Sequence, residues 1–177
     1  REQYNGTWKT KKKQMQENKI GFIVDDLSSS QLSYEVISSI NSFDTSFDQD
    51  FVVFFENSSP MVIEPFFGVM NLQELWGFDG IAIATSVSSC LSLSNTQSPI
   101  KKFFYVWDLE WMRNHGKEFE STIQAFSNPE VTLIARSKDH AKAIENYCNR
   151  KVEHIVNDFN LEKILRIINE QPIYQQV

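Results

Sequence analysis

Short unbroken runs of apolar residues alternate along this chain with segments whose apolar residues have helical spacing. The unbroken runs predict strands buried on both faces of a parallel sheet, and they occupy 20–24, 51–55, 81–84, 103–106, 131–134 and 152–156. A weaker extended segment lies at 61–63. The helical spacing, with hydroxyl or amide side chains as N-caps, predicts helices after 28–30, over 70–76, over 87–93, from 109 through 126, over 141–148 and from 161 onward.

Strands that alternate with helices indicate right-handed βαβ units and a mostly parallel sheet. We therefore expect one Rossmann-like α/β domain over 19–171, with about six strands flanked by helices. The lysine-rich segment 1–18 is expected to be a flexible basic arm, and 172–177 a carboxyl-terminal tail. The residues expected in the core, each within an apolar run, are Ile23, Val53, Ile83, Tyr105 and Ile134.

Composition narrows the classes of partner. The 177 residues contain 17 Lys and Arg against 23 Asp and Glu, a formal net charge of −6. A non-specific nucleic-acid binder needs a basic face to displace counterions, so we do not expect nucleic acid as a direct ligand. No apolar run approaches the roughly 18 residues of a membrane span, and we expect no membrane partner.

The two cysteines favour a cytoplasmic protein with reduced thiols, although one disulfide between Cys90 and Cys148 stays open. Neither belongs to a C-x-x-C pair, so the spacing indicates neither a redox motif nor a zinc site.

The ends of the predicted strands define a candidate site, because ligands of open α/β sheets bind outside the carboxyl ends of the strands. Asp25 and Asp26 follow the first strand, where a carboxylate can act as general base toward a hydroxyl acceptor; capping of the next helix is the alternative. Arg136 and Ser137 stand before a helix, where they contact a phosphate or where Ser137 is simply an N-cap.

A second acidic pair, Asp108 and Glu110, follows the strand at 103–106. Carboxylates in this pattern can hold a cation that bridges a diphosphate, or they can cap a helix and occupy its first turn. Trp107 beside them can stack on a sugar or pack in the core. We expect no tightly bound structural metal, because the chain lacks a cluster of Cys and His ligands.

Several motifs are absent from the sequence. No G-x-G-x-x-G follows the first strand, where an aspartate pair would also repel a dinucleotide pyrophosphate. The chain contains no P-loop, no G-x-S-x-G and no H-E-x-x-H motif either. We therefore expect no resident cofactor.

Four stretches carry a resemblance to a known family: KIGFIVDDLSSSQLSYEVI, IKKFFYVWDLEWM, VTLIARSKDHAKAIENYC and VEHIVNDFNLEKIL. They resemble the amino-terminal domain of GT-B-type glycosyltransferases, especially small glycosyltransferase-like proteins carried by bacteriophages. In that family the amino-terminal domain holds the acceptor, a second Rossmann domain binds the nucleotide-sugar, and transfer takes place in the cleft between them.

The resemblance implies a sugar or nucleotide-sugar related ligand at the strand-end loops. The candidate catalytic residues are Asp25, Asp26 and Asp108. The candidate substrate-binding residues are Ser28, Ser86, Trp107, Glu110, Arg136 and Ser137. A donor domain would need about 150 further residues after Val177, so we expect either half of an enzyme or a reduced protein that kept the domain for binding. Activity of the chain alone is left open, as is completion of the cleft by a second copy or another protein.

A competing similarity starts from Asp25 and Asp26, because response-regulator receivers place an acidic pair after their first strand. The later strands end in Glu56-Asn57 or Thr85-Ser86 where the phosphorylated aspartate would stand. The alternatives to a glycosyltransferase-like protein are therefore a non-catalytic α/β binding module and a pseudo-receiver, each acting through a protein partner.

Overall fold

Each of the six apolar runs contributes a strand in the computed structural model of the chain, and one further strand joins them. The structure describes residues 18–28, 30–43, 49–112 and 116–170. The strands are β1 (Lys19–Asp26), β2 (Asp50–Asn57), β3 (Gly68–Asn71), β4 (Ile81–Ala84), β5 (Lys101–Val106), β6 (Thr132–Ala135) and β7 (His154–Ile155). The α-helices are α2 (Gln31–Asn41), α3 (Val87–Asn95), α4 (Lys117–Ser127), α5 (Lys138–Cys148) and α6 (Leu161–Glu170). Short 3-10 helices are η1 (Leu72–Gly77), η2 (Glu110–Met112) and η3 (Asn157–Phe159).

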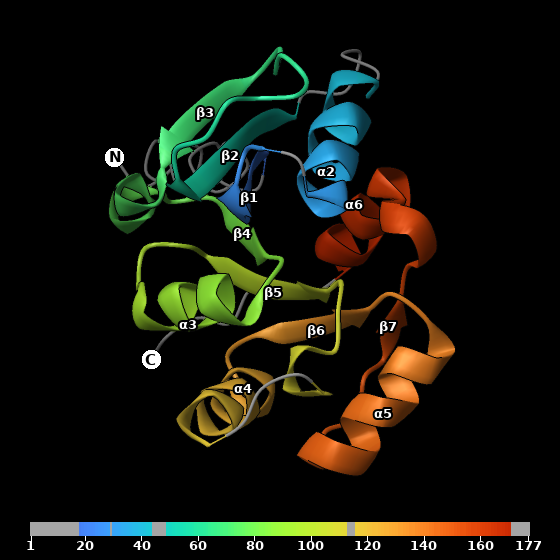
Figure 1. Cartoon of the computed structure of the whole chain (residues 1–177). Coiled ribbons are helices and arrows are strands. Elements are labelled where there is room, and N and C mark those ends of the chain that lie inside the picture. Colours follow the sequence, from blue (N-terminus) through green and yellow to red (C-terminus); the bar gives the residue numbers. More distant parts are fainter. Residues whose placement is uncertain (1–17, 29, 44–48, 113–115, 171–177) are drawn as a thin grey trace, which may run out of the picture.

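The seven strands form one sheet in the order β3-β2-β1-β4-β5-β6-β7, and every pairing is parallel. The predicted α/β class with a parallel sheet is confirmed, with seven strands instead of about six. The order changes direction beside β1, which pairs with β2 on one side and β4 on the other (Figure 1). The order of the first six strands, 3-2-1-4-5-6, is Rossmann-like, and it differs from the 2-1-3-4-5 order of receivers by the short edge strand β3.

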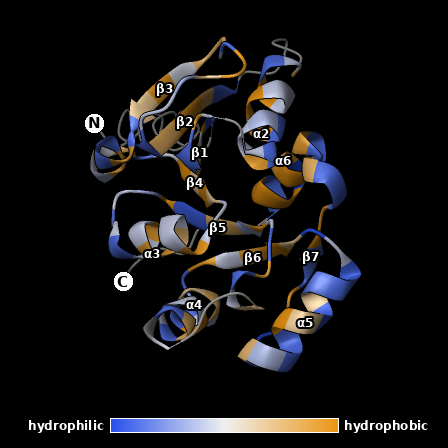
Figure 2. Ribbon diagram, in the orientation of Figure 1, coloured by the Kyte–Doolittle hydropathy of each residue, from blue (hydrophilic) through white to orange (hydrophobic). Residues whose placement is uncertain are grey.

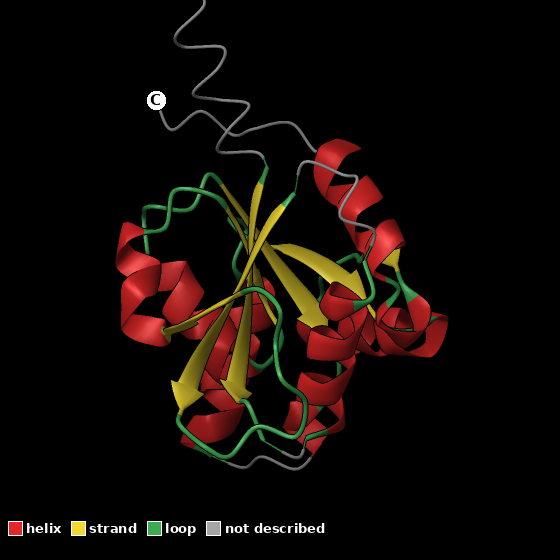
Figure 3. Cartoon of the chain, turned by 90° about the horizontal axis from the view of Figure 1, so that it is seen from above, coloured by secondary structure: helices red, strands yellow, loops and turns green. Residues whose placement is uncertain are grey.

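Helices cover both faces of the sheet, because β-strand side chains alternate between the faces (Figure 3). Phe103 and Tyr105 of β5 pack with α2 and α6, whereas Phe104 and Val106 pack with α3, α4 and α5. Hydrophobic colour runs along the strands, while the helices also carry hydrophilic positions (Figure 2). The side chains expected in the core, Ile23, Val53, Ile83, Tyr105 and Ile134, are all fully buried.

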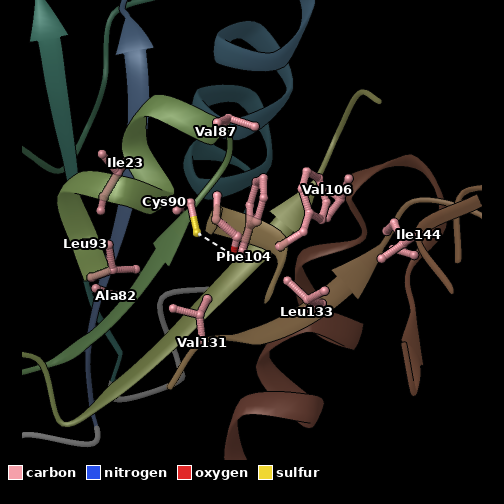
Figure 4. Close-up of a cluster of buried hydrophobic side chains, with 14 of the residues drawn as sticks. Ile23, Ala82, Val87, Cys90, Leu93, Phe104, Val106, Val131, Leu133 and Ile144 are labelled. Atoms are coloured by element: carbon pink, nitrogen blue, oxygen red, sulfur yellow. Dashed lines mark hydrogen bonds between the residues drawn. The ribbon is translucent and has the colours of Figure 1, made fainter. Parts of the chain in front are cut away.

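The core on the α3 side of the sheet is a continuous apolar cluster (Figure 4). Cys90 of α3 lies in it, and its Sγ donates to the main-chain oxygen of Ala125 at 3.8 Å. Burial raises the pKa of this thiol to about 12. Cys148 is also a free thiol, so the structure contains no disulfide between the two cysteines.

The predictions around β3 were wrong in detail. The extended segment expected at 61–63 is not a strand, and β3 lies at 68–71. Pro60 and Pro65 bracket that segment and limit the backbone hydrogen bonds that a strand needs. The short helix expected over 70–76 begins only at Leu72, after β3, and is the 3-10 helix η1.

The bounds of the last strand and of the helix after β5 also differ from the prediction. The last strand, expected over 152–156, contains only His154 and Ile155. The helix expected from Leu109 is limited at first to η2, and α4 begins at Lys117 after Gly116, whose φ is +62°. Tyr147 of α5 is 68% exposed, whereas Ala141, Ile144 and Cys148 of the same helix are buried. The segments expected as arm and tail lie outside the described residues, apart from Asn18.

Candidate functional site: a cleft at the carboxyl edge of the sheet

A cleft of about 360 Å³ opens at the carboxyl edge of the sheet, between the ends of β1, β4 and β5 and the first turn of α2. It lies where the strand order changes direction, which is the usual ligand position in open α/β sheets. We call it the carboxyl-edge cleft. Its lining residues are Asp25, Asp26, Ser30, Gln31, Leu32, Ser33, Thr85, Ser86, Trp107, Asp108 and Glu110.

The two aspartates that end β1 are held by different hydroxyl groups. The Asp25 carboxylate accepts a hydrogen bond from the Ser86 hydroxyl at 2.5 Å. The Asp26 carboxylate accepts from the backbone N–H and the hydroxyl of Ser28, at 2.8 and 2.7 Å. These bonds fix the orientation of both carboxylates at the cleft. Asp25 remains exposed and Asp26 is half-buried.

The end of β4 forms a rigid part of the cleft wall. Thr85 donates its hydroxyl to the carbonyl oxygen of Ile23 at 2.6 Å, which ties β4 to β1. Ser86 is the N-cap of α3, and its hydroxyl accepts from the N–H of Ser89 at 3.1 Å. Both hydroxyl residues are buried, so this wall is preorganised.

The end of β5 supplies the opposite wall. The Glu110 carboxylate accepts from the N–H of Val87 at 2.9 Å, and thus caps α3 from outside that helix. A carboxylate at this position also interacts favourably with the helix dipole. Asp108 accepts from the N–H of Leu109 at 2.8 Å. The capping alternative is thus met only in part: Glu110 stands in the first turn of η2 but caps α3, and the bond printed for Asp108 is to its immediate neighbour and caps no helix. Both carboxylates line the cleft.

Trp107 lies in the cleft wall under a cation. The Arg136 guanidinium is 4.1 Å from the centroid of the indole, and Tyr105 packs against the indole with ring centroids 6.4 Å apart. Burial raises the pKa of the Tyr105 phenol, whose hydroxyl donates to the carbonyl oxygen of Val156 at 2.8 Å. The indole is consequently fixed in place.

The structure brings most of the predicted site residues together. The cleft is lined by Asp25, Asp26, Ser86, Trp107, Asp108 and Glu110. Three predicted residues lie outside its lining: Ser28 holds Asp26, Arg136 stacks on Trp107, and Ser137 caps α5 by accepting from the His140 N–H at 3.1 Å.

Sequence reasoning missed the contribution of the first turn of α2. Gln31, Leu32 and Ser33 line the cleft, and the Ser33 hydroxyl donates to the carbonyl oxygen of Asp26 at 2.6 Å. The available signal was positional, because the helix that follows the first strand begins beside the point where the strand order reverses.

The cleft is strongly negative. Four of its lining residues are acidic, and none of the described residues that line it is Lys, Arg or His. An anionic ligand would face like charges, whereas hydroxyl groups and cations would find hydrogen-bond acceptors. Within the described ranges, no group of three or more His, Cys, Asp or Glu residues is arranged to hold a metal ion.

No family model matches this sequence, and comparisons with curated proteins and with solved structures return no match. Across the described part of the chain, no helix combines the length and apolar character needed to cross a membrane.

Proposed function

We propose that this chain is a glycosyltransferase-like carbohydrate-binding domain whose carboxyl-edge cleft receives the sugar acceptor. The observation that carries the proposal is the convergence of four carboxylates, several hydroxyl groups and one indole in a single cleft where the sheet order reverses. The resemblance of the four sequence stretches to acceptor-type GT-B domains agrees in position with this cleft.

The chemistry of the lining favours a polyhydroxylated ligand. Sugar hydroxyls donate hydrogen bonds, and ionised carboxylates are acceptors that form stronger bonds than neutral groups. A nucleoside diphosphate, by contrast, is usually bound by backbone N–H groups or cationic side chains. The α3 N-terminus could offer such an N–H at Val87, but the Glu110 carboxylate already accepts from it. The cleft therefore suits the acceptor rather than the donor.

In this proposal Asp25 is the general base for transfer. Its carboxylate takes the proton of the acceptor hydroxyl while that oxygen forms a bond to the anomeric carbon of the donor. The nucleoside diphosphate leaves with the electrons of the broken glycosidic bond. The Ser86 hydroxyl, 2.5 Å from the Asp25 carboxylate, orients the base.

A second candidate is a non-catalytic sugar-binding module. The acidic lining favours it, because none of the described residues that line the cleft is cationic and the nearby Arg136 guanidinium is stacked on the Trp107 indole. Holding both substrates together accounts for about 7–11 kcal/mol of a transfer barrier. A chain that binds only the acceptor would turn over efficiently only after another domain, or a second copy, supplies the donor site.

Nuclear magnetic resonance titrations of the ¹⁵N-labelled chain test the proposal. Monosaccharides such as glucose, galactose and N-acetylglucosamine should shift the Trp107 indole resonance, and uridine diphosphate should not. Asp25→Asn should weaken sugar binding, whereas Asp139→Asn, an exposed change in the first turn of α5, should leave it unchanged.

The same samples are then incubated with nucleotide-sugars and assayed for transfer and hydrolysis. Efficient turnover by a monomer that is lost in Asp25→Asn would establish a complete enzyme and contradict the half-enzyme interpretation. Binding of uridine diphosphate at Trp107 without any response to sugars would overturn the proposed acceptor site.

A further inference from the structure

A second opening of about 400 Å³ lies between η1 and α3, on the sheet face that carries α3. We call it the η1–α3 groove. Its lining residues are Glu56, Asn71, Leu72, Gln73, Leu75, Trp76, Ser92, Asn95 and Thr96. The connection from β3 to β4, residues 72–80, contains the short helix η1 and no α-helix, which leaves this opening beside α3.

The side chain that distinguishes this groove is Trp76, which is 63% exposed. Its backbone is anchored, since the Ser98 hydroxyl donates to the Trp76 carbonyl oxygen and the preceding residue, Leu75, is buried in the core. Trp107, in contrast, lies under Arg136. A large exposed ring on an anchored backbone can serve as a contact surface for a ligand.

Apart from Leu72 and Leu75, the remaining lining is polar and nearly uncharged. Gln73 and Asn95 are exposed amides, and Ser92 adds a hydroxyl, while Glu56 is the one charged residue among the described residues that line the groove. Amides donate and accept hydrogen bonds, and an indole face packs against the C–H groups of a sugar ring. Neither a phosphate nor a polycation would find complementary charge here, whereas a neutral carbohydrate would find both kinds of contact.

Hydrogen bonds link the Glu56 end of the groove to the first turn of α3 and to the end of β1, beside the carboxyl-edge cleft. Ser86 bonds to Asp25 in the cleft, and two residues later the Ser88 hydroxyl donates to the Glu56 carboxylate in the groove at 3.3 Å. Asn57, next to Glu56, donates its side-chain N–H to the carbonyl oxygen of Asp25 at 3.4 Å. The groove thus begins near the cleft at Glu56 and leads away from it, because its residues Asn95 and Thr96 lie at the C-terminal end of α3.

We propose that the η1–α3 groove binds the distal units of an oligosaccharide whose terminal unit occupies the carboxyl-edge cleft. Binding of the terminal unit in the carboxyl-edge cleft rests on the proposed function of that cleft. Binding of carbohydrate in the groove itself rests on Trp76 and the amides alone. The acceptor is accordingly an oligosaccharide or a glycan chain, and contacts remote from the reacting hydroxyl contribute to its binding.

The test uses indole ¹⁵N–H resonances, assigned with Trp76→Phe and Trp107→Phe. The probes are glucose and N-acetylglucosamine and their 1,4-linked oligomers of two to six units. Monomers should shift Trp107 alone, while the longer oligomers should shift both indoles and bind about five- to tenfold more tightly, as an added aromatic contact allows.

Trp76→Ala should abolish the gain in affinity with chain length and leave monomer affinity unchanged. Tyr147→Ala, which removes another exposed aromatic side chain, is the matched control and should keep the gain. Circular dichroism of each variant separates lost contacts from lost folding.

The outcomes distinguish the two proposals. Oligomers that shift Trp107 without shifting Trp76, and with no gain in affinity, would overturn the groove and leave the cleft intact. Shifts at Trp76 alone would support the groove and overturn the proposed function of the cleft. Unchanged resonances at both indoles with every sugar would overturn both.

Discussion

The carboxyl edge of the sheet carries carboxylates and the amino edge carries cations, and the two sets of charged groups have different roles. Because all strands are parallel and each helix runs back across the sheet, helix N-termini gather at the carboxyl edge and helix C-termini at the amino edge. The helix dipole favours anions at the first edge and cations at the second. Both edges follow this rule, and the carboxyl edge opens into the cleft that receives the sugar acceptor in our proposal.

At the amino edge three cations bond to carbonyl oxygens near helix C-termini. Lys101 donates to Ile168 of α6 at 2.9 Å, and Lys102 to Ser94 of α3 at 3.4 Å. Both lysines are buried, although they are adjacent in β5, because successive side chains reach opposite faces of the sheet. Arg150 donates to the carbonyl oxygen of Phe126 in α4 at 3.0 Å.

At the carboxyl edge the carboxylates keep access to solvent. Asp25 and Asp108 are exposed, and Glu110 is half-buried although it caps α3. The hydrogen-bonded cations of the amino edge therefore stabilise the fold, whereas the carboxylates of the carboxyl edge remain accessible to a ligand. Substitutions at the amino edge should therefore lower stability more than substitutions in the cleft.

The largest effect is expected for Arg150→Ala. The guanidinium also donates to the carbonyl oxygens of Asn128 and Val131, so its loss leaves three acceptors without this partner. Hydrogen bonds from charged groups contribute about 1.5–3 kcal/mol each, and we expect a loss of about 3 kcal/mol in the free energy of unfolding.

Urea denaturation measures this loss, and Lys151→Ala is the matched control. Lys151 is 77% exposed in its pair with Glu153, so its removal should change stability by less than about 0.5 kcal/mol. Equal effects of the two substitutions would contradict the structural role given to Arg150.

Lys101→Met should destabilise the fold by about 2 kcal/mol. Methionine fills much of the same space but cannot donate to the carbonyl oxygen of Ile168 at the end of α6. Lys19→Met removes a surface ion pair with Asp79, whose two side chains are 39% and 42% exposed, and should cost less than about 1 kcal/mol. Thermal and urea unfolding of both variants check this order, and a Lys101→Met protein as stable as the parent chain would refute it.

Cys90, buried in the core beside α3, gives a pH-dependent prediction. At pH 8 and below the thiol is mostly protonated in both the folded and the unfolded chain. Above that pH the unfolded chain releases its proton first, since burial raises the pKa of the folded thiol from 9.0 to about 12. Stability therefore falls as pH rises from 9 toward 12, by about 1.4 kcal/mol at pH 10 from this group.

The measurement is urea unfolding of the parent chain and of Cys90→Ala at pH 8 and pH 10. The variant starts less stable because it loses buried volume, but it should lose about 1.4 kcal/mol less between the two pH values. Identical losses in both proteins would show that the thiol does not titrate as its burial implies.

The parts of the fold that sequence could predict are those coded by long local patterns. Ile23 and Tyr105 lie within unbroken apolar runs, and their burial follows from that pattern alone. The edge strand at 68–71 has only four residues, mostly exposed, and no periodicity to separate it from a loop. The buried lysine Lys101 could not be foreseen, because its partner Ile168 is 67 positions away.

In the candidate site, too, some residues could be predicted from local sequence patterns and others depend on the tertiary structure. Asp25, Ser86 and Trp107 follow directly after predicted strands, so the rule for parallel sheets is enough to place them at one edge. Gln31 follows a capping serine on a helix, and its neighbours in the sequence give no sign that it faces the cleft. The exposure of Trp76 depends on how η1 crosses the sheet, which no local pattern encodes.

The most direct measurement is a titration of glucose and N-acetylglucosamine into the double variant Asp25→Asn, Asp108→Asn, followed at the Trp107 indole. The two substitutions should change the free energy of unfolding by no more than about 0.5 kcal/mol, the smallest effect expected here. Both positions are exposed, and asparagine can still accept a hydrogen bond. We predict a folded protein whose Trp107 resonance no longer responds to sugars that shift it in the parent chain. An undiminished sugar response in the folded double variant would contradict the claim that the carboxyl-edge carboxylates serve binding.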